Sequence, residues 1–182
     1  MKVTTDPREA SSDHHRAVSE FVTAARAIAP DRWEQPLGEG KWTPAQIAEH
    51  VRLSYEVFAA QAAGGQGLRV RTSWWMRQLL RWRFLGGILQ QGVLPAGARA
   101  PREVRPGDGP FDRDHVLLAL QEAAAEAESG LVKRWTDPTC VMTHHVFGDL
   151  RPPEGMRLIT VHTRHHAAQL APRAQTARVH AD

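Results

Sequence analysis

The sequence predicts an all-α fold, an up-and-down four-helix bundle with one additional helix, in a single domain over residues 1–182. Apolar residues recur at helical spacing in five segments, and no run alternates apolar and polar residues clearly enough to predict a strand. The length suits one domain with a sizeable core, and no linker divides it. Long helices joined in this way pack side by side, so facing helices can build a site in the interior of the bundle.

The first two helices are predicted over Arg8–Ala29 and Pro44–Ala63. The first ends before a proline, which cannot continue a helix. The second follows Thr43, a natural N-cap, and Gln46 completes a capping box with it. Two adjacent glycines end this helix. These signals place the start of the second helix at a proline that suits the first helical turn.

The third helix is predicted over Ser73–Gln90 and is apolar around most of its circumference, apart from a polar sector at Arg77, Gln78 and Arg81. The arginines exclude a membrane span. Such a helix must be covered on several sides, either within its own bundle or by a second copy of the chain, and we expect a homodimer. A basic amphipathic helix on a membrane surface is the alternative. The tryptophans expected to be buried are Trp74, Trp75 and Trp82.

A loop rich in proline and glycine follows over Gly92–Pro110 and could cover one end of the bundle. The fourth helix is predicted over Arg113–Trp135, with Asp112 as its N-cap. Its alanine-rich segment, Ala123–Ala125, permits close approach to a neighbouring helix. The fifth helix is predicted over Pro153–Ala177, although a proline stands in its last turns.

Two histidines of the fifth helix, His162 and His166, are four residues apart. They differ by only about 40° around the helix axis, so both rings leave the helix on one side, one turn apart. The apolar residues on either side of this pair predict that it faces the core; these are Leu158, Ile159 and Leu170. The spacing can hold a metal, but pairs of this kind also occur on helix surfaces, and the zinc-protease form H-E-x-x-H is absent.

His50 lies at the centre of an apolar stripe on the second helix, whose opposite face carries Glu49, Arg52 and Glu56. Taken alone, an inward histidine can equally be a core residue that hydrogen-bonds a carbonyl or hydroxyl group. Three inward imidazoles from two helices instead favour a metal site with open positions, as catalytic metals require. The metal itself is not predictable from three imidazoles, which accept nickel, zinc, iron and copper.

Composition excludes several classes of protein. The single cysteine, Cys140, rules out an internal disulfide and has no C-x-x-C partner for redox catalysis. The formal net charge of +3 is modest and the arginines are scattered among acids, so we expect no nucleic-acid partner. No secretion signal is present at the N-terminus, and we expect a cytoplasmic protein.

Three motifs in this order resemble the DinB/YfiT-like superfamily of four-helix-bundle metalloproteins, with matching spacing over roughly residues 21–170. They are the run Trp42–Pro44 leading into Ile47–His50, the segment His145–Leu150, and His162–His166 with Gln169. The resemblance implies one divalent metal, zinc or nickel, held by His50, His162 and His166, in agreement with the helical periodicity. It does not assign His165 as a ligand.

The resemblance implies several activities. Family members include thiol-S-transferases that use bacillithiol, maleylpyruvate isomerases that use mycothiol, and an iron-binding domain of sulfoxide synthases. The length of 182 residues argues against the synthases, and we do not expect their further catalytic domain. We therefore expect a metal-dependent transferase that directs a low-molecular-weight thiol at an electrophilic small molecule. A metal-dependent hydrolase and a non-catalytic stress protein, in which the metal only staples the bundle, are the alternatives.

The sequence contains no certain general base. Glu49 is predicted to face away from His50, and Asp149 lies in a loop of unknown position. His145 in the same loop is a candidate for proton transfer or for holding a ligand, or it fixes the loop by a hydrogen bond. Gln169, close to His162 on the helical wheel, could orient a ligand or line a pocket. A fourth ligand from His144 or His145 would close the site and favour the staple.

Overall fold

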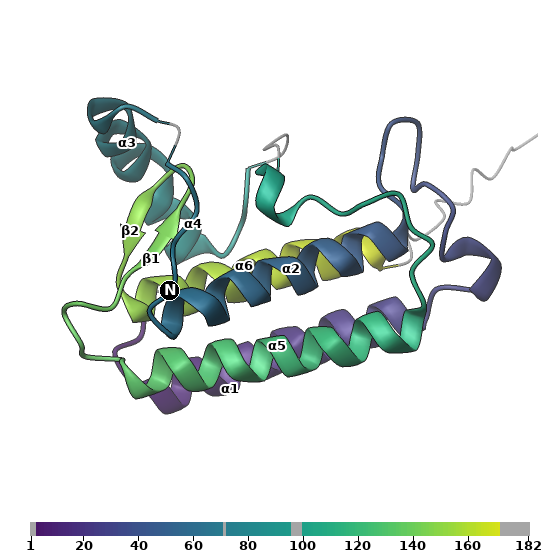
Figure 1. The fold of residues 1–182 in the computed structure, drawn as a ribbon, viewed down its shortest axis with the longest axis horizontal. Helices are drawn as coiled ribbons and strands as arrows, with labels where there is room; N and C mark the ends of the chain where they lie inside the picture. The colour runs from purple at the N-terminus through teal and green to yellow at the C-terminus, as the bar shows by residue number, and fades with distance from the viewer. Residues whose placement is uncertain (1–2, 71, 96–99, 172–182) are drawn as a thin grey trace, which may run out of the picture.

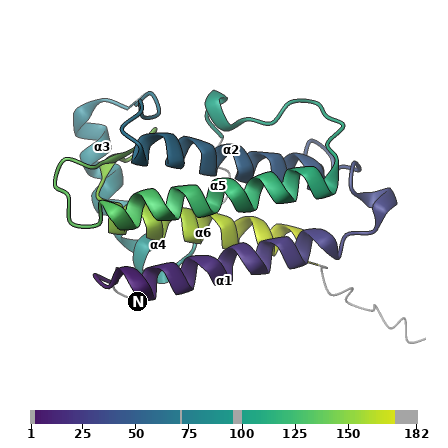
Figure 2. The ribbon, with the colours of Figure 1, turned by 60° about the horizontal axis from the view of Figure 1, so that its bottom comes forward.

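The computed structural model describes residues 3–70, 72–95 and 100–171. Its four long helices lie side by side (Figures 1 and 2). They are α1 (Pro7–Arg26), α2 (Pro44–Ala62), α5 (Arg113–Lys133) and α6 (Pro152–Leu170). The predicted all-α class and the four-helix bundle are confirmed. The proposed continuation of the last helix to Ala177 falls outside the described residues.

The long helices do not alternate in direction as those of the predicted up-and-down bundle would, because the connection from α2 to α5 returns along the length of the bundle (Figure 1). The ends of α2 and α5 therefore lie together, and Arg134 donates from Nη1 to the carbonyl oxygen of Ala62 at 3.2 Å. Gly130 faces Ala62 so closely that a Cβ at position 130 would come within 2.7 Å of the alanine Cβ. The closest approach of α5 to α2 is thus at Gly130, in a parallel pairing, and not at the alanine-rich segment Ala123–Ala125 from which the sequence predicted it.

Local signals form the ends of the helices as expected. The capping box of α2 is complete, since Thr43 Oγ1 accepts from the backbone N–H of Gln46 and the Gln46 side chain accepts from that of Thr43. Asp112 accepts from the backbone N–H of His115 at 2.8 Å and caps α5. These bonds satisfy N–H groups that a helix start otherwise leaves without a partner.

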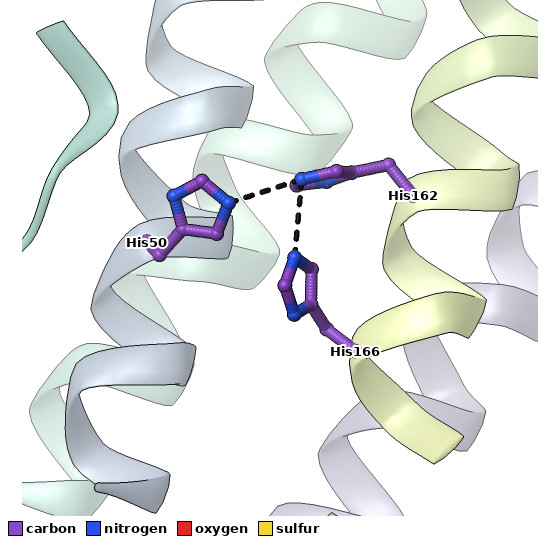
Figure 3. A group of neighbouring side chains, drawn as sticks. All are labelled: His50, His162 and His166. Atoms are coloured by element: carbon purple, nitrogen blue, oxygen red, sulfur yellow. Dashed lines mark hydrogen bonds between the residues drawn. The ribbon is translucent and has the colours of Figure 1, made fainter. Parts of the chain in front are cut away.

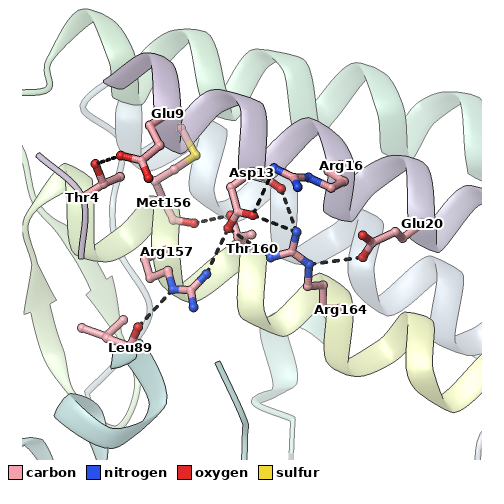
Figure 4. Close-up of polar contacts among 10 residues, drawn as sticks. All are labelled: Thr4, Glu9, Asp13, Arg16, Glu20, Leu89, Met156, Arg157, Thr160 and Arg164. Atoms are coloured by element: carbon pink, nitrogen blue, oxygen red, sulfur yellow. Dashed lines mark hydrogen bonds and ion pairs between the residues drawn. The ribbon is translucent and has the colours of Figure 1, made fainter. Parts of the chain in front are cut away.

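Ion pairs join α1 to α6 along their outer side (Figure 4). The carboxylate of Asp13 accepts from Arg157 at 3.0 Å and from Arg164 at 2.9 Å and 3.0 Å. Arg164 also donates to Glu20 at 3.2 Å. Arg157 also donates to the carbonyl oxygen of Leu89 and so holds the segment that contains Leu89 against α6. One face of α6 is thereby held against α1, which leaves another face to meet α2.

The third predicted helix forms as α3 (Trp74–Leu80), a π-helical segment η2 (Arg81–Leu85) and α4 (Gly86–Gln91). The π turn advances the chain by an extra residue per turn, so the faces before and after it do not share one helical wheel. The segment is buried at Leu85, Ile88 and Leu89. By contrast, α3 projects away from the four long helices (Figure 1). The expected burial of the tryptophans within the monomer is wrong: Trp74, Trp75 and Trp82 are 69%, 61% and 81% exposed.

Two short strands, β1 (Met142–His144) and β2 (Gly148–Leu150), form an antiparallel hairpin before α6, in which Met142 pairs with Leu150 and His144 with Gly148. The sequence did not predict them, because three residues are too few to show the alternation of a strand. Arg81 donates to the carbonyl oxygens of Phe147 and Asp149 and thus anchors the π segment on the hairpin. Short 3-10 turns, η1 (Pro30–Arg32) and η3 (Arg102–Val104), complete the described elements. None of the helices in the described part of the chain has both the length and the apolar content needed to cross a bilayer.

Candidate metal centre

Three histidine rings converge between α2 and α6. His50 extends from α2, and His162 and His166 extend from successive turns of α6 toward it (Figure 3). His50 and His166 are 4% and 7% exposed, and His162 is partly buried. The inward orientation predicted for all three rings is therefore observed. Their ring nitrogens lie within 4.8 Å of one another, close enough to hold one metal ion.

The distances from His162 Nε2 to the other two Nε2 atoms suit a transition-metal ion. His162 Nε2 lies 3.1 Å from His50 Nε2 and 3.2 Å from His166 Nε2. Imidazole nitrogens bind zinc at about 2.0–2.1 Å, which separates two ligand nitrogens by about 2.9 Å at a right angle and about 3.3 Å at the tetrahedral angle. Both observed distances fall in this interval. The residues could therefore hold an ion without a rearrangement of the helices.

Hydrogen bonds on the far sides of two rings point their Nε2 lone pairs inward. His50 Nδ1 donates to the carbonyl oxygen of Val104 in η3 at 2.7 Å. His166 Nδ1 donates to Oε1 of Gln169 at 2.9 Å, and the amide of Gln169 donates to His165 Nε2 at 3.1 Å. With a proton on Nδ1, a neutral imidazole presents Nε2 as an acceptor or metal ligand. Gln169 thus orients a candidate ligand, as the sequence suggested.

Hydrogen bonds between the described residues leave the polar atoms of His162 poorly matched. Nδ1 of His162 is buried and, among the described residues, has no hydrogen-bond partner. Nε2 of this ring can donate a proton to only one of its two neighbours, so one contact brings two lone pairs together. A cation at the centre accepts all three lone pairs at once. The chemistry of the donor set thus fits a metal better than a hydrogen-bond network.

Burial keeps the three imidazoles neutral, as metal binding requires. It lowers the pKa of His166 to about 3, with a further contribution from His50. It lowers the pKa of His162 well below the usual value, to which His166 and His50 also contribute. The pKa of His50 is likewise lowered by burial, partly offset by its bond to Val104.

The hairpin histidines do not belong to this cluster. His144 accepts from the backbone N–H groups of Val146 and Phe147 at 3.2 Å and 3.3 Å, and its ring stacks on Phe147. His144 therefore fixes the loop. The ring of His145 lies beside that of His144, with centroids 4.4 Å apart. Neither histidine is a member of the ligand group found in the described residues, so neither closes the site as a fourth ligand.

The two acids considered as bases are held elsewhere. Both oxygens of Glu49 accept from Arg52 at 2.7 Å, on the face of α2 opposite His50. Asp149 accepts from the hydroxyl of Thr143 at 2.8 Å within the hairpin. Sequence reasoning missed Val104, whose backbone carbonyl orients His50. Since any residue supplies a carbonyl, no signal in the sequence could have identified it.

The comparison with protein families gives a match that covers most of the chain. The family model described as the DinB superfamily matches residues 14–170. The chain belongs to the DinB superfamily. The matched residues include all four long helices in whole or large part, and the three converging histidines. The searches of curated proteins and of solved structures found no match.

Proposed function

We propose that this DinB-superfamily protein is a metal-dependent thiol-S-transferase, which joins a low-molecular-weight thiol to an electrophilic small molecule. The observation that carries the proposal is the convergence of three neutral imidazoles without a fourth protein ligand among the described residues. Zinc sites that only stabilise a fold usually have four protein ligands, whereas catalytic sites keep a position for water or substrate. A three-histidine site therefore supports a catalytic role for the metal over a purely structural one.

The donor set also favours a thiol over water as the nucleophile. No carboxylate belongs to the three-histidine group in the described part of the chain. A free thiol has a pKa of about 8.5 and is deprotonated outright by a coordinating metal, whereas water starts from about 15.7 and hydrolysis usually recruits a base. A divalent ion would thus supply the thiolate near neutral pH. Zinc or nickel is the ion we propose, because imidazole suits both.

The residues of the chain would bind and orient rather than transfer protons. Val104 and Gln169 hold the rings of His50 and His166 at fixed angles. The ring of Trp42 packs on His50, with centroids 5.0 Å apart, and forms an apolar wall beside the cluster. An apolar wall excludes water from one side of a site and so favours transfer to an organic electrophile over hydrolysis.

The proposal is tested by measuring metal content and conjugation together. The untagged chain should contain close to one divalent transition metal, and it should accelerate loss of monochlorobimane in the presence of bacillithiol, mycothiol or cysteine. Chelation should abolish the acceleration and the added metal should restore it. Ester turnover without thiol would identify a hydrolase instead. Stoichiometric metal with neither activity, together with a chelated protein that unfolds more readily, would support the staple.

Metal content and conjugation in substituted proteins distinguish the proposed ligands from His145 of the hairpin. The double variant His162→Ala, His166→Ala should lose both metal and conjugation, whereas His145→Ala should keep the metal and slow only the rate. His115→Ala is a matched control, because His115 is an exposed histidine on α5 and belongs to neither histidine group of the described residues. Metal content unchanged in the double variant would remove the ligand assignment. Metal loss in His145→Ala as complete as in His50→Ala would make His145 a ligand and favour the staple.

A further inference from the structure

A second group of potential ligands lies between α1 and α5. His15 Nε2 lies 2.5 Å from Oε2 of Glu128, and His14 Nδ1 lies 3.3 Å from the same oxygen. Ligand atoms of all three residues lie within 4.8 Å of one another. His14 is only 1% exposed, whereas the side chain of His15 is 69% exposed. The group combines one fixed imidazole with one that can move.

A buried chain of hydrogen bonds continues from the other side of the His14 ring. His14 Nε2 lies 3.0 Å from the hydroxyl of Tyr55 on α2, and this hydroxyl lies 2.7 Å from Oγ1 of Thr163 on α6. Thr163 Oγ1 donates to the carbonyl oxygen of Ile159 at 2.9 Å. His14, Tyr55 and Thr163 are each at most 1% exposed, so water does not replace these partners.

Only one assignment of donors and acceptors satisfies every contact in this series of hydrogen bonds. A carbonyl oxygen only accepts, so Thr163 gives its single proton to Ile159 and must accept from Tyr55. Tyr55 has then used its own proton, and its oxygen accepts from His14 Nε2. A neutral His14 therefore carries its proton on Nε2 and directs the lone pair of Nδ1 at the carboxylate of Glu128. A lone pair facing a carboxylate oxygen is repulsive unless a positive charge lies between them.

Two species can supply that charge, namely a second proton on His14 or a metal ion. A proton accounts for the pair of His14 and Glu128 alone. A metal ion also accounts for His15, whose ring nitrogen is directed at the same carboxylate oxygen from the adjacent position of the helix. Two imidazoles and a carboxylate form a donor set that zinc accepts with a position left open. The hydrogen bond to Tyr55 is the kind of contact that fixes the ring of a metal ligand.

The surroundings leave room for such an ion and its remaining ligands. The three residues line a pocket of about 410 Å³ on the outer surface of α1 and α5, together with Ser19, Arg26 and Gln121. The contact between His15 and Glu128 is shorter than two ligands of one ion allow, by about 0.4–0.8 Å. The exposed His15 can withdraw by this amount without disturbing the helix.

We propose that His14, His15 and Glu128 form a second divalent transition-metal site, separate from the three-histidine centre and independent of the proposed transferase activity. Zn²⁺ is the ion to test, because it accepts mixed nitrogen and oxygen ligands. The site would bind more weakly than the first, since the exposed side chain of His15 must be ordered on binding.

The first test is stoichiometry with Zn²⁺ alone. After chelation and equilibrium dialysis, the untagged chain should bind two equivalents, the double variant His15→Ala, Glu128→Gln should bind one, and the control His115→Ala should bind two. The variant His162→Ala, His166→Ala should bind one equivalent, which must disappear when the two variants are combined. If the three-histidine centre bound no Zn²⁺, the parent chain would bind one equivalent and the double variant His15→Ala, Glu128→Gln none, so the difference between them would still be one equivalent. A double variant that binds as many equivalents as the parent chain would overturn the second site.

The second test reads His14 directly and avoids any substitution in the core. In protein with ¹⁵N-labelled histidine, long-range ¹H–¹⁵N spectra at neutral pH should show a proton on Nε2 of His14 with and without Zn²⁺, and no proton on Nδ1 once Zn²⁺ is bound. The first equivalent of Zn²⁺ fills the three-histidine centre. The second equivalent should then shift the ¹⁵N resonances of His14 Nδ1 and His15 Nε2 and leave those of His115 unchanged. An imidazolium at His14 that persists with both protons in excess Zn²⁺ would show that a proton, not a metal, occupies the position.

Discussion

Gln169 is a single residue that orients His166, because it hydrogen-bonds the side of the ring that faces away from the cluster. Its Oε1 accepts from His166 Nδ1 at 2.9 Å, while its amide nitrogen reaches His165. Such partners fix both the protonated nitrogen and the angle of a ligand ring. The exposed position of Gln169 means that its replacement leaves the core packing unchanged.

We expect Gln169→Ala to fold normally and to lower the affinity for Zn²⁺ by about 10–100-fold, because loss of such an orienting partner typically has this effect. Competition with a chromophoric chelator measures the change. Gln78→Ala, at an exposed glutamine on α3, should bind as the parent chain does. Equal affinity in both variants would mean that Gln169 does not orient the ligand.

Acid should destabilise the metal-free protein through its buried histidines. The pKa of His166 is lowered by burial to about 3, and that of His144 is lowered to about 3 by burial and by His145. In the unfolded chain both rings titrate near 6.5. Between these values the unfolded chain binds protons that the folded chain does not, so the free energy of unfolding falls as the pH falls below about 6.5.

At pH 5 the loss should be on the order of 2 kcal/mol for each of these two rings, relative to pH 7.5. Urea unfolding of chelated protein at the two pH values measures it. His166→Gln should show a smaller difference between the two pH values than the parent chain. In the metal-loaded protein, acidification should release the ion, with a midpoint that the metal affinity moves below 6.5. A pH-independent unfolding midpoint in the chelated protein would contradict the burial of these rings.

At the scale of helices, the pairing of α1 with α6 decides how His162 and His166 meet α2. Asp13 is the acceptor shared by Arg157 and Arg164, and it joins two turns of α6 to one position of α1 (Figure 4). The hydrogen bond from Arg164 lowers the pKa of Asp13, although burial opposes the shift. Its contribution to stability is therefore present above the usual pKa of 3.8 and is lost as the pH falls through the lowered value.

We expect Asp13→Asn to lower the free energy of unfolding at pH 7 by about 1–3 kcal/mol, because two partly buried guanidinium groups lose a charged acceptor. Urea unfolding with a bound-metal measurement checks both stability and the site. Glu39→Gln, at an exposed loop carboxylate, should change stability by less than about 0.5 kcal/mol. A similar small change in Asp13→Asn would show that these ion pairs contribute nothing to the pairing.

At the scale of the whole molecule, the exposed apolar side of α3 and η2 remains uncovered by the chain itself. The three tryptophans and Leu79 are between 47% and 81% exposed. Arg81 is engaged with the hairpin, so the projecting side is held in place rather than free to fold back. Apolar surface gathered in this way typically marks a contact with another molecule, and we expect a second copy of the chain.

Multi-angle light scattering should therefore report a dimer, and substitution of Trp74, Trp75 and Trp82 by serine should shift it to a monomer without a change in helix content. The matched control is Leu118→Ser, since Leu118 is 57% exposed on α5, away from this side. A parent chain that remains monomeric at every accessible concentration would refute the homodimer.

The sequence by itself determined the four long helices and the inward direction of the three histidines. Capping residues such as Thr43 and Asp112 act within one turn, and the 3.6-residue period sets the side of a helix on which His50, His162 and His166 lie. These are local effects, so they can be worked out before the fold is known. The resemblance to the DinB superfamily rested on the same residues, and the family match confirmed it.

Only the tertiary structure decided the features that depend on distant contacts. The parallel pairing of α2 with α5, the carbonyl of Val104 on His50 and the ring of His14 between Tyr55 and Glu128 each join residues more than 40 positions apart. The exposed tryptophans likewise depend on a π turn that changes the face of the helix after Arg81. No periodic pattern records such contacts, because packing between elements, rather than local preference, selects them.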